Sequence, residues 1–138
     1  MKKFANKKIL LNYLEEVFPQ VAGKIQILKI ESHLTLVKFR TSEADLRPGG
    51  TISGPSMFEL ADCAFYVAIL WRDPDPMSVT VHSSMDFFNR PKNKNLFAKA
   101  KIRKYGTKLV VGEVILFSEN EENLVAQALM TYARPVKK

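Results

Sequence analysis

The sequence of 138 residues has a single cysteine, Cys63, and no long hydrophobic run. One thiol excludes an internal disulfide, and this is typical of proteins from reducing compartments. The longest apolar run, Cys63 to Trp71, has nine residues, about half of what a membrane-spanning helix requires. The basic start, residues 1–8, is not followed by a continuous apolar region and a cleavage site. We therefore predict no signal peptide and a cytoplasmic location.

The sequence lacks the residue patterns that several classes of active site require. The chain has only two histidines, and no second ligand stands at a spacing typical of zinc sites, so we predict no metal site. Ser53 lies in Gly50-Thr-Ile-Ser-Gly54, which is not the Gly-x-Ser-x-Gly pattern of a serine nucleophile at a strand–helix turn. There are no repeats and no low-complexity segments. We expect no bound cofactor.

Acidic residues are few, 14 against 21 basic ones, and the formal net charge is +7. This excess favours an anionic partner such as nucleic acid, an acidic membrane or a small molecule that carries phosphate. A solvated basic surface that keeps the protein soluble explains it equally well. No strand combines aromatic and basic residues as RNA-binding sheets do. We therefore expect neither a nucleic acid nor a membrane as partner.

Hydrophobic periodicity predicts an amphipathic helix over residues 7–18, with Leu10, Leu14 and Phe18 on one face. Alternating apolar residues then predict a β-hairpin over 24–31 and 34–40. A loop rich in turn formers follows at 41–53. A buried helix follows and ends near residue 72, because the two prolines after it, Pro74 and Pro76, cannot continue a helix. Four more strand-like segments follow, the last three as an antiparallel meander: 78–88, 96–104, 108–117 and 124–133.

The segment from Arg47 to Asp62 carries the most information, because a Gly/Pro-rich loop there runs directly into a very apolar helix. From Met57 to Trp71, 13 of 15 residues are apolar, the exceptions being Glu59 and Asp62. A helix that is apolar on nearly all sides is buried, and a charge on it is costly unless it is paired, hydrated or used. A helix N-terminus can also present N–H groups to a ligand. We therefore predict an active site here.

The pattern leaves some local alternatives open. The buried helix begins either with Pro55 as its first helical residue or with a capping box of Ser56 and Glu59. Glu59 is expected to have a capping or interface role. Asp62 could instead be a structural polar group bonded to a neighbouring subunit. Cys63 is expected to be a buried, inert thiol.

One helix that is hydrophobic all round needs a concave apolar surface, and a strongly curved antiparallel sheet supplies it. We predict one α+β domain over residues 1–138, with the sheet wrapped around the helix and a further helix at the N-terminus. This layout and the loop–helix segment resemble the hotdog fold, and within it the phenylacetyl-CoA-thioesterase-like branch of the acyl-CoA thioesterases. The family pattern is His-Gly-Gly, six residues, then Asp or Glu; here it reads Ser53-Gly54-Pro55, six residues, then Asp62.

The resemblance, which covers roughly residues 40–135, implies hydrolysis of an acyl-CoA thioester. Gly54 would donate its N–H to the thioester oxygen, and Asp62 would act as general base or as nucleophile. Thr80 takes the strand position of a hydroxyl that steadies the water, and a hydrogen bond from this hydroxyl would help to hold Asp62 ionised. The chain departs from the family where Ser53 replaces histidine and where Pro55 replaces the second glycine. It also lacks an asparagine that some members have near the position of Arg47.

Further residues are predicted to contact the substrate or its CoA. Ser53, Pro55 and Arg47 surround the helix entry, and His82 is expected on the same side of its strand as Thr80. A basic cluster around two turns is expected to bind the CoA phosphates: Arg90, Lys92, Lys94, Arg103, Lys104 and Lys108. The resemblance also implies a homodimer or a dimer of dimers, with the site at the interface.

The rival hypotheses are a non-catalytic protein that binds acyl-CoA or fatty acid, a nucleic-acid-binding module and a hotdog dehydratase. The first is favoured by the replacements at Ser53 and Pro55. The second rests only on the net charge. The third lacks a histidine near the helix entry.

Overall fold

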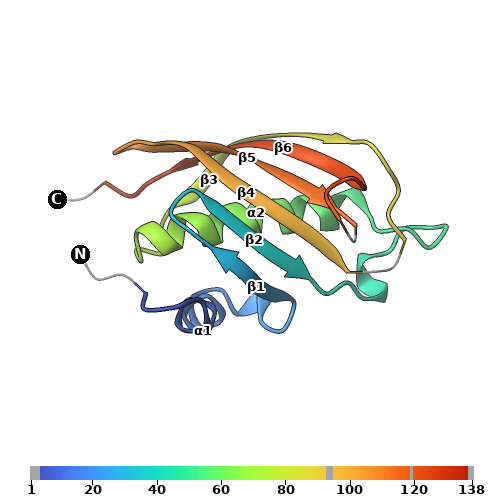
Figure 1. Ribbon diagram of the computed structural model, residues 1–138, viewed down its shortest axis with the longest axis horizontal. Coiled ribbons are helices and arrows are strands. Elements are labelled where there is room, and N and C mark those ends of the chain that lie inside the picture. Colours follow the sequence, from blue (N-terminus) through green and yellow to red (C-terminus); the bar gives the residue numbers. More distant parts are fainter. Residues whose placement is uncertain (1–3, 93–94, 119, 137–138) are drawn as a thin grey trace.

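The computed structural model describes residues 4–92, 95–118 and 120–136. A curved antiparallel sheet lies against a long helix, α2 (Gly54–Arg72), and a shorter helix, α1 (Lys7–Val17), lies beside it (Figure 1). The strands are β1 (Ile25–Ile30), β2 (Leu34–Phe39), β3 (Val79–Phe87), β4 (Leu96–Tyr105), β5 (Leu109–Phe117) and β6 (Leu124–Ala133). Short 3₁₀ turns occupy Pro19–Val21 and Glu43–Asp45. The predicted helix around residues 7–18, the hairpin and the later strands are confirmed to within a residue or two at each end.

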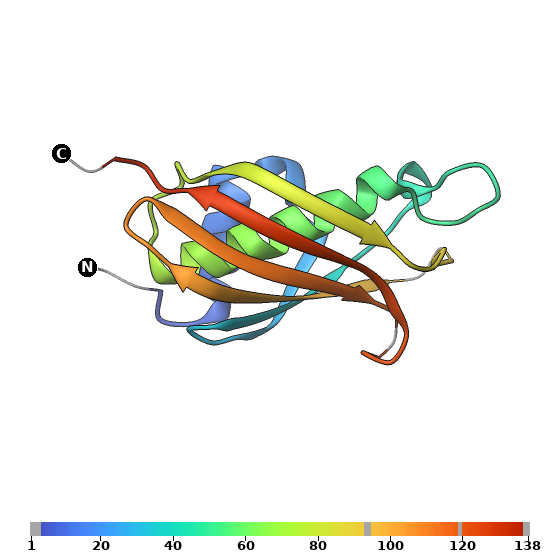
Figure 2. The same cartoon turned by 90° about the horizontal axis from the view of Figure 1, so that it is seen from above.

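The six strands follow the order β1-β2-β4-β5-β6-β3, and every neighbouring pair is antiparallel. The predicted meander of the last three strands is confirmed. β3 pairs with β6 and forms one edge of the sheet, and β1 forms the other. The chain therefore crosses β4, β5 and β6 between β2 and β3, and α2 makes this crossing (Figure 2).

The core lies between the concave face of the sheet and α2. Twelve of the 19 residues of α2 are buried, as its apolar composition predicts. Small side chains on β4 and β6, among them Ala98, Ala100, Ala126 and Ala128, are also buried. Small residues allow the sheet to approach the helix closely and to bend around it, so the large side chains of α2 fill the space between them.

α1 begins at an N-cap, Asn6, whose side chain accepts a hydrogen bond from the N–H of Ile9 at 3.0 Å. Its buried residues, Leu10 and Leu14, are the ones that the periodicity placed on its apolar face. No helix among the described residues is long and apolar enough to cross a membrane.

Candidate active site

Asp62 lies in the third turn of α2, where two hydroxyl groups donate hydrogen bonds to its carboxylate. Thr80 Oγ1 lies 2.6 Å from Oδ1, and the Tyr132 hydroxyl lies 2.7 Å from the same oxygen. Thr80 on β3 and Tyr132 on β6 are direct partners in the sheet, so two neighbouring strands present their hydroxyls at one level of the helix. The predicted juxtaposition of Thr80 and Asp62 is present in the structure.

Tyr132 was not anticipated from the sequence. Alternation along β6 places it on the inward face, with Met130 and Ala128. That pattern does not tell which residue of α2 Tyr132 will contact. The contact depends on how β6 packs on the helix and on its register with β3, which places Tyr132 beside Thr80. Burial, followed by the charge of Asp62, raises the pKa of Tyr132. The phenol therefore stays protonated and remains a hydrogen-bond donor to the carboxylate.

The N-terminus of α2 leaves one backbone donor unused. Ser53 is the N-cap, and its hydroxyl accepts from the N–H of Ser56 at 3.2 Å. The N–H of Met57 donates to the carbonyl of Ser53 at 3.1 Å, and Pro55 has no N–H. The N–H of Gly54 has no acceptor among the residues that the structure describes. Of the first helical donors, that of Gly54 is therefore the one available to a ligand.

This geometry resolves the two predicted helix starts. The helix begins at Gly54, so Pro55 is its second residue and not its first. A capping box of Ser56 and Glu59 is wrong, because the N-cap is Ser53 and Ser56 lies within the first turn, where its hydroxyl donates to Asp45 Oδ1 at 2.8 Å. Glu59 forms an ion pair with Lys24 at 3.4 Å, and both side chains are partly exposed.

Asp45 holds the loop against the helix entry, a role that sequence reasoning missed. Its side chain is buried and accepts from Ser56 and from the N–H of Ser42, the latter at 2.9 Å. Its carbonyl accepts from the N–H of Ser53 at 2.7 Å. The following loop is also tied down, because the N–H of Ile52 donates to Pro91 at 2.9 Å. The bonds that Asp45 accepts from Ser53 and Ser56 therefore hold the cap that leaves the Gly54 N–H unused.

A pocket of about 560 Å³ opens beside this helix entry. Exposed Arg47 and Arg90 face it from two different loops, and Gly54 and Met57 contribute the helix end. The other lining residues are Ile52, Phe87, Phe88 and Asn89. The pocket thus combines apolar walls, a free N–H and two guanidinium groups, a combination that suits an anionic ligand with an apolar part.

One protomer does not bring Gly54 and Asp62 together. The two residues are eight positions apart on α2, which is about 12 Å along the helix axis at ~1.5 Å per residue. Asp62 is not among the residues that line the pocket at Gly54. A single carbonyl group therefore cannot contact the N–H of Gly54 and the carboxylate of Asp62 from the same chain.

His82 lies on the opposite face of the sheet from Thr80, so the prediction that they share a face is wrong. The register shifts between Thr80 and His82, so Thr80 pairs with Tyr132 whereas His82 pairs with Thr131. Successive residues of β6 point to opposite faces. A β-bulge at Val81 therefore turns the exposed His82 away from Asp62.

The prediction that the basic residues around two turns form one cluster is also wrong within a single protomer. Arg90 lines the pocket at the first residue of α2, whereas Arg103 and Lys104 lie next to Tyr105. The guanidinium of Arg72, the last residue of α2, stacks on Tyr105 at 4.1 Å. Arg90 and the pair Arg103 and Lys104 therefore lie near opposite ends of a 19-residue helix, whose ends are about 27 Å apart along its axis. Arg103 is moreover paired with Glu113 at 2.7 Å.

The remaining basic residues of that set are placed as follows. Lys92 lines a neighbouring pocket with Arg90 and Asn89. Lys108 precedes β5, at the end of the sheet where Lys104 lies. Lys94 lies outside the described residues.

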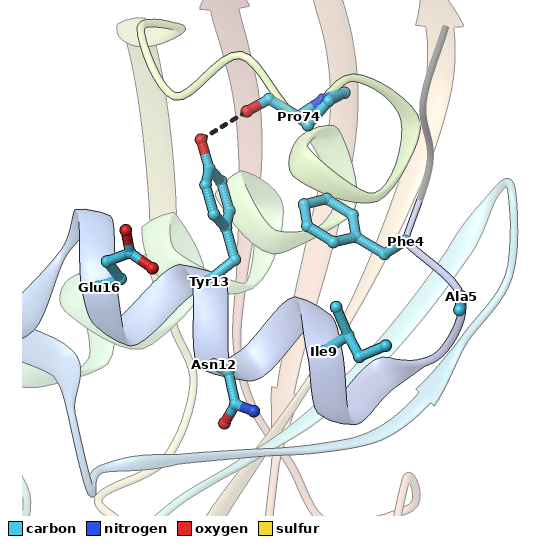
Figure 3. Close-up of a pocket in the computed structure, with 7 residues that line it drawn as sticks. All are labelled: Phe4, Ala5, Ile9, Asn12, Tyr13, Glu16 and Pro74. Carbon is cyan, nitrogen blue, oxygen red and sulfur yellow. Dashed lines mark hydrogen bonds between the residues drawn. The ribbon is translucent and has the colours of Figure 1, made fainter.

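A second pocket, of about 610 Å³, lies between α1 and the loop that follows α2 (Figure 3). Phe4, Ile9 and Tyr13 line it, and the Tyr13 hydroxyl donates to the carbonyl of Pro74 at 2.8 Å. It lies toward the C-terminal end of α2 and contains none of the predicted site residues. Among residues 4–92, 95–118 and 120–136, no group of three or more histidine, cysteine or acidic side chains could hold a metal ion.

Cys63 is buried, as predicted, and burial raises the pKa of its thiol, with a further contribution from the charge of Asp62. The thiol is therefore protonated at neutral pH and is not poised as a nucleophile.

The chain is similar to several known proteins. The family model of the thioesterase superfamily matches residues 49–125, which include the helix entry, Asp62 and Thr80. The solved structure of a putative thioesterase from Silicibacter sp. TM1040 is 40% identical, with a TM-score of 0.88, and the match covers 99% of this chain and 96% of that one. A putative esterase of Saccharolobus solfataricus is 28% identical over 86% of this chain and 77% of its own length.

The PaaI protein of the phenylacetic acid degradation operon of E. coli has the same fold. It is 20% identical, with a TM-score of 0.77, over 91% of this chain and 90% of that one. The predicted resemblance to hotdog-fold thioesterases is thereby confirmed. The chain belongs to the thioesterase superfamily and has the hotdog fold of its thioester hydrolases.

Proposed function

We propose that this protein hydrolyses acyl-CoA thioesters to a free acid and CoA. The observation that carries the proposal is the unused N–H of Gly54, which lies at the N-terminus of α2 beside a pocket with two arginines. Negative charge grows on the thioester oxygen during attack, and a fixed backbone donor at a helix N-terminus stabilises it. Gly54 also lets the substrate approach the backbone closely, since it has no side chain.

Asp62 supplies the second requirement, either by activating water or by attacking the carbonyl itself. As general base it takes a proton from water while the water oxygen bonds to the carbonyl carbon. The tetrahedral intermediate then expels the CoA thiolate, which receives a proton, and the acid is released. As nucleophile, Asp62 would form a mixed anhydride with the acyl group while the C–S bond breaks and the CoA thiolate leaves. Water would then hydrolyse the anhydride to the free acid and supply the proton that CoA takes up. Both routes leave Asp62 unchanged at the end of the cycle.

CoA is proposed as the carrier because its phosphates match the charge of the pocket. Arg47 and Arg90 project from the two loops that enclose the pocket at Gly54, and guanidinium groups bind phosphate in a forked geometry. Lys92 lies in the adjoining pocket and would add a further positive charge. The acyl group would then lie on the apolar side formed by Met57 and Phe87.

We further propose a homodimer in which each site combines two chains. β3 is an edge strand of nine residues, with exposed Val79, Val81 and Phe87 and no proline or lysine to block pairing. If β3 pairs with its copy around the middle of the strand, the two copies run antiparallel. Thr80 of one chain then lies opposite the Phe87 end of the other.

This pairing would bring together Gly54 and Asp62 from different chains, although the two residues of one chain are about 12 Å apart along α2. Thr80 is bonded to Asp62, and a side chain added at Gly54 would lie 3.6 Å from the ring of Phe87, so Gly54 adjoins the far end of β3. Asp62 of one chain therefore approaches Gly54 of the partner subunit. Assembly of two such dimers remains a prediction, as does the cytoplasmic location inferred from the single free thiol.

The activity is tested by thiol release from a panel of acyl-CoA substrates, with wild type and Asp62→Asn. We expect turnover in the wild type and a loss of at least about 100-fold in the variant, since a base or nucleophile is removed. Glu31→Gln is the matched control, because this exposed carboxylate pairs with Lys29 at 3.6 Å and follows β1, the sheet edge opposite β3. Equal turnover by wild type and Asp62→Asn would refute the proposal.

The same panel decides about the non-catalytic alternative. Ser53 and Pro55 replace the family's histidine and glycine, so this helix entry offers one free N–H and no imidazole. Tight binding of acyl-CoA without turnover that depends on Asp62 would identify a binding protein instead.

The shared site is tested by mixing two inactive variants, Asp62→Asn and Gly54→Pro. Random pairing gives mixed dimers as about half of the population, and each contains one intact site and one doubly altered site. We expect the mixture to recover about a quarter of wild-type activity. If both residues act within one chain, no mixed dimer has an intact site and the mixture stays inactive.

A further inference from the structure

Tyr132 contacts Asp62 twice from the concave face of the sheet. Its hydroxyl lies 2.7 Å from Oδ1 and 3.1 Å from the main-chain carbonyl of Asp62. The residue is 3% exposed, so the hydroxyl would have no water to replace these contacts. The buried hydroxyl of Tyr132 is therefore hydrogen-bonded to Asp62, the carboxylate that the proposed reaction needs.

The position of the hydroxyl is fixed by packing. The ring of Tyr132 lies 5.5 Å from the ring of Phe65 in a tilted arrangement and 6.2 Å from the ring of Tyr66 in a stacked one. Both neighbours are on α2, the helix that also carries Asp62. The distance from the hydroxyl to the carboxylate is thus set by contacts between β6 and one segment of α2.

The two oxygens of Asp62 are not equivalent. Thr80 and Tyr132 both donate to Oδ1, and no side chain or N–H in the described part of the chain donates to Oδ2. A carboxylate held by two donors on one oxygen cannot rotate freely about its terminal bond without losing both bonds. Its second oxygen is then kept in one place.

We propose that Tyr132 is a positioning residue that, together with Thr80, anchors Oδ1 of Asp62 so that Oδ2 is the oxygen that meets the substrate or the water. This inference rests on the proposed hydrolysis and adds to it the reacting atom and a residue from a third element. Tyr132 itself does not touch the substrate. Its effect is on orientation, and small losses of orientation at a reacting group are expensive in rate.

The test compares Tyr132→Phe with Tyr13→Phe. Each variant removes one phenol hydroxyl that donates a hydrogen bond and keeps the ring, but Tyr13 donates to the carbonyl of Pro74 at 2.8 Å and not to Asp62. We expect Tyr132→Phe to lower kcat roughly 10- to 100-fold with KM unchanged within about twofold. Tyr13→Phe is expected to keep kcat within about threefold. A purely structural hydroxyl would lower the melting temperature in both variants and spare kcat in both.

A double-mutant cycle then links the effect to Asp62. In the Asp62→Asn background, Tyr132→Phe should change the residual rate by less than about twofold, because the carboxylate that it orients is gone. An undiminished loss in that background would overturn the inference. So would wild-type kcat in folded Tyr132→Phe while Asp62→Asn is inactive, and that result would leave the proposed function intact.

Thr80 provides the second variant if Tyr132→Phe fails to fold. Thr80→Val removes the other donor to Oδ1 with little change of shape, and Thr80→Ser keeps it. We expect Val to lower kcat and Ser to restore it to within about threefold of wild type. Equal kcat for Val and Ser would overturn the anchoring of Oδ1. Absence of any turnover dependent on Asp62 in the wild type would overturn the proposed function and this inference with it.

Discussion

Replacing Gly54 by proline removes one N–H group from the helix entry and changes little else in the fold. Gly54 is the first residue of α2, the helical position that best accepts proline. The preceding residue, Ser53, already has φ −74° and ψ 154°, the extended conformation that a residue before proline adopts. No acceptor among the described residues loses a bond, since this N–H donates to none of them.

The size of the two expected effects differs widely. A Cβ at position 54 would lie 3.6 Å from the Phe87 ring, an ordinary contact, so we expect the free energy of unfolding to change by less than about 1 kcal/mol. For a domain of this size that corresponds to a melting shift of roughly 3–5 °C at most. Loss of one oxyanion donor costs about 2.7–4 kcal/mol of transition-state stabilisation, which is about 100- to 1,000-fold in kcat.

Gly54→Ala is the matched control, because it adds the same Cβ and carries the same restriction before Pro55 but keeps the N–H. The assay is thiol release from an acyl-CoA, with melting curves for all three proteins. We expect alanine to retain at least about a tenth of wild-type kcat and proline to fall well below that. Equal kcat in the folded alanine and proline variants would refute the role of this N–H.

Three further predictions concern the carrier, pH and the thiol. Arg90→Ala should raise KM for acyl-CoA about 5- to 30-fold, whereas Arg103→Ala, at the other end of the sheet, should leave KM within about twofold; equal increases would indicate net charge and not a site. Burial raises the pKa of Tyr66 from 10.0 to about 12. Because this pKa is raised in the folded state, the associated stability is complete below pH 10 and is lost as the pH rises toward 12. Urea unfolding between pH 9 and 11.5 should show this slope, and Tyr66→Phe should reduce it. Cys63 is 3% exposed and its pKa is raised by burial, so an aromatic disulfide reagent should label it only when urea unfolds the chain; rapid labelling of the native protein would contradict its burial.

Local sequence predicted the elements well because their signals are local. The apolar spacing of Leu10 and Leu14 and the alternation within the strands depend on neighbours a few residues away. The buried helix was evident from its composition, and a curved sheet followed because one apolar helix must be covered on nearly all sides. Asp62 was identified for the same reason, as a charge where a charge is costly.

The helix start shows where local signals compete. Ser53 and Ser56 are both good cap residues, and the local sequence does not rank them. In the structure Ser53 is the N-cap, and Asp45, eleven residues away from Ser56, contacts both serines: it accepts the Ser56 hydroxyl, and its carbonyl accepts from the N–H of Ser53. The cap that leaves the N–H of Gly54 free is thus held by contacts that no local pattern contains.

By itself, the sequence determined which segments are helix and strand, which helix is buried, and which carboxylate is out of place there, because burial and periodicity are written in residue type and spacing. Only the tertiary structure decided that Tyr132 meets Asp62, that a bulge turns His82 away, and that Arg90 and Arg103 lie at opposite ends of the molecule. These placements depend on the register between strands. A shift of one residue moves a side chain to the other face, and the energy that selects the register comes from the packing of the whole sheet around α2.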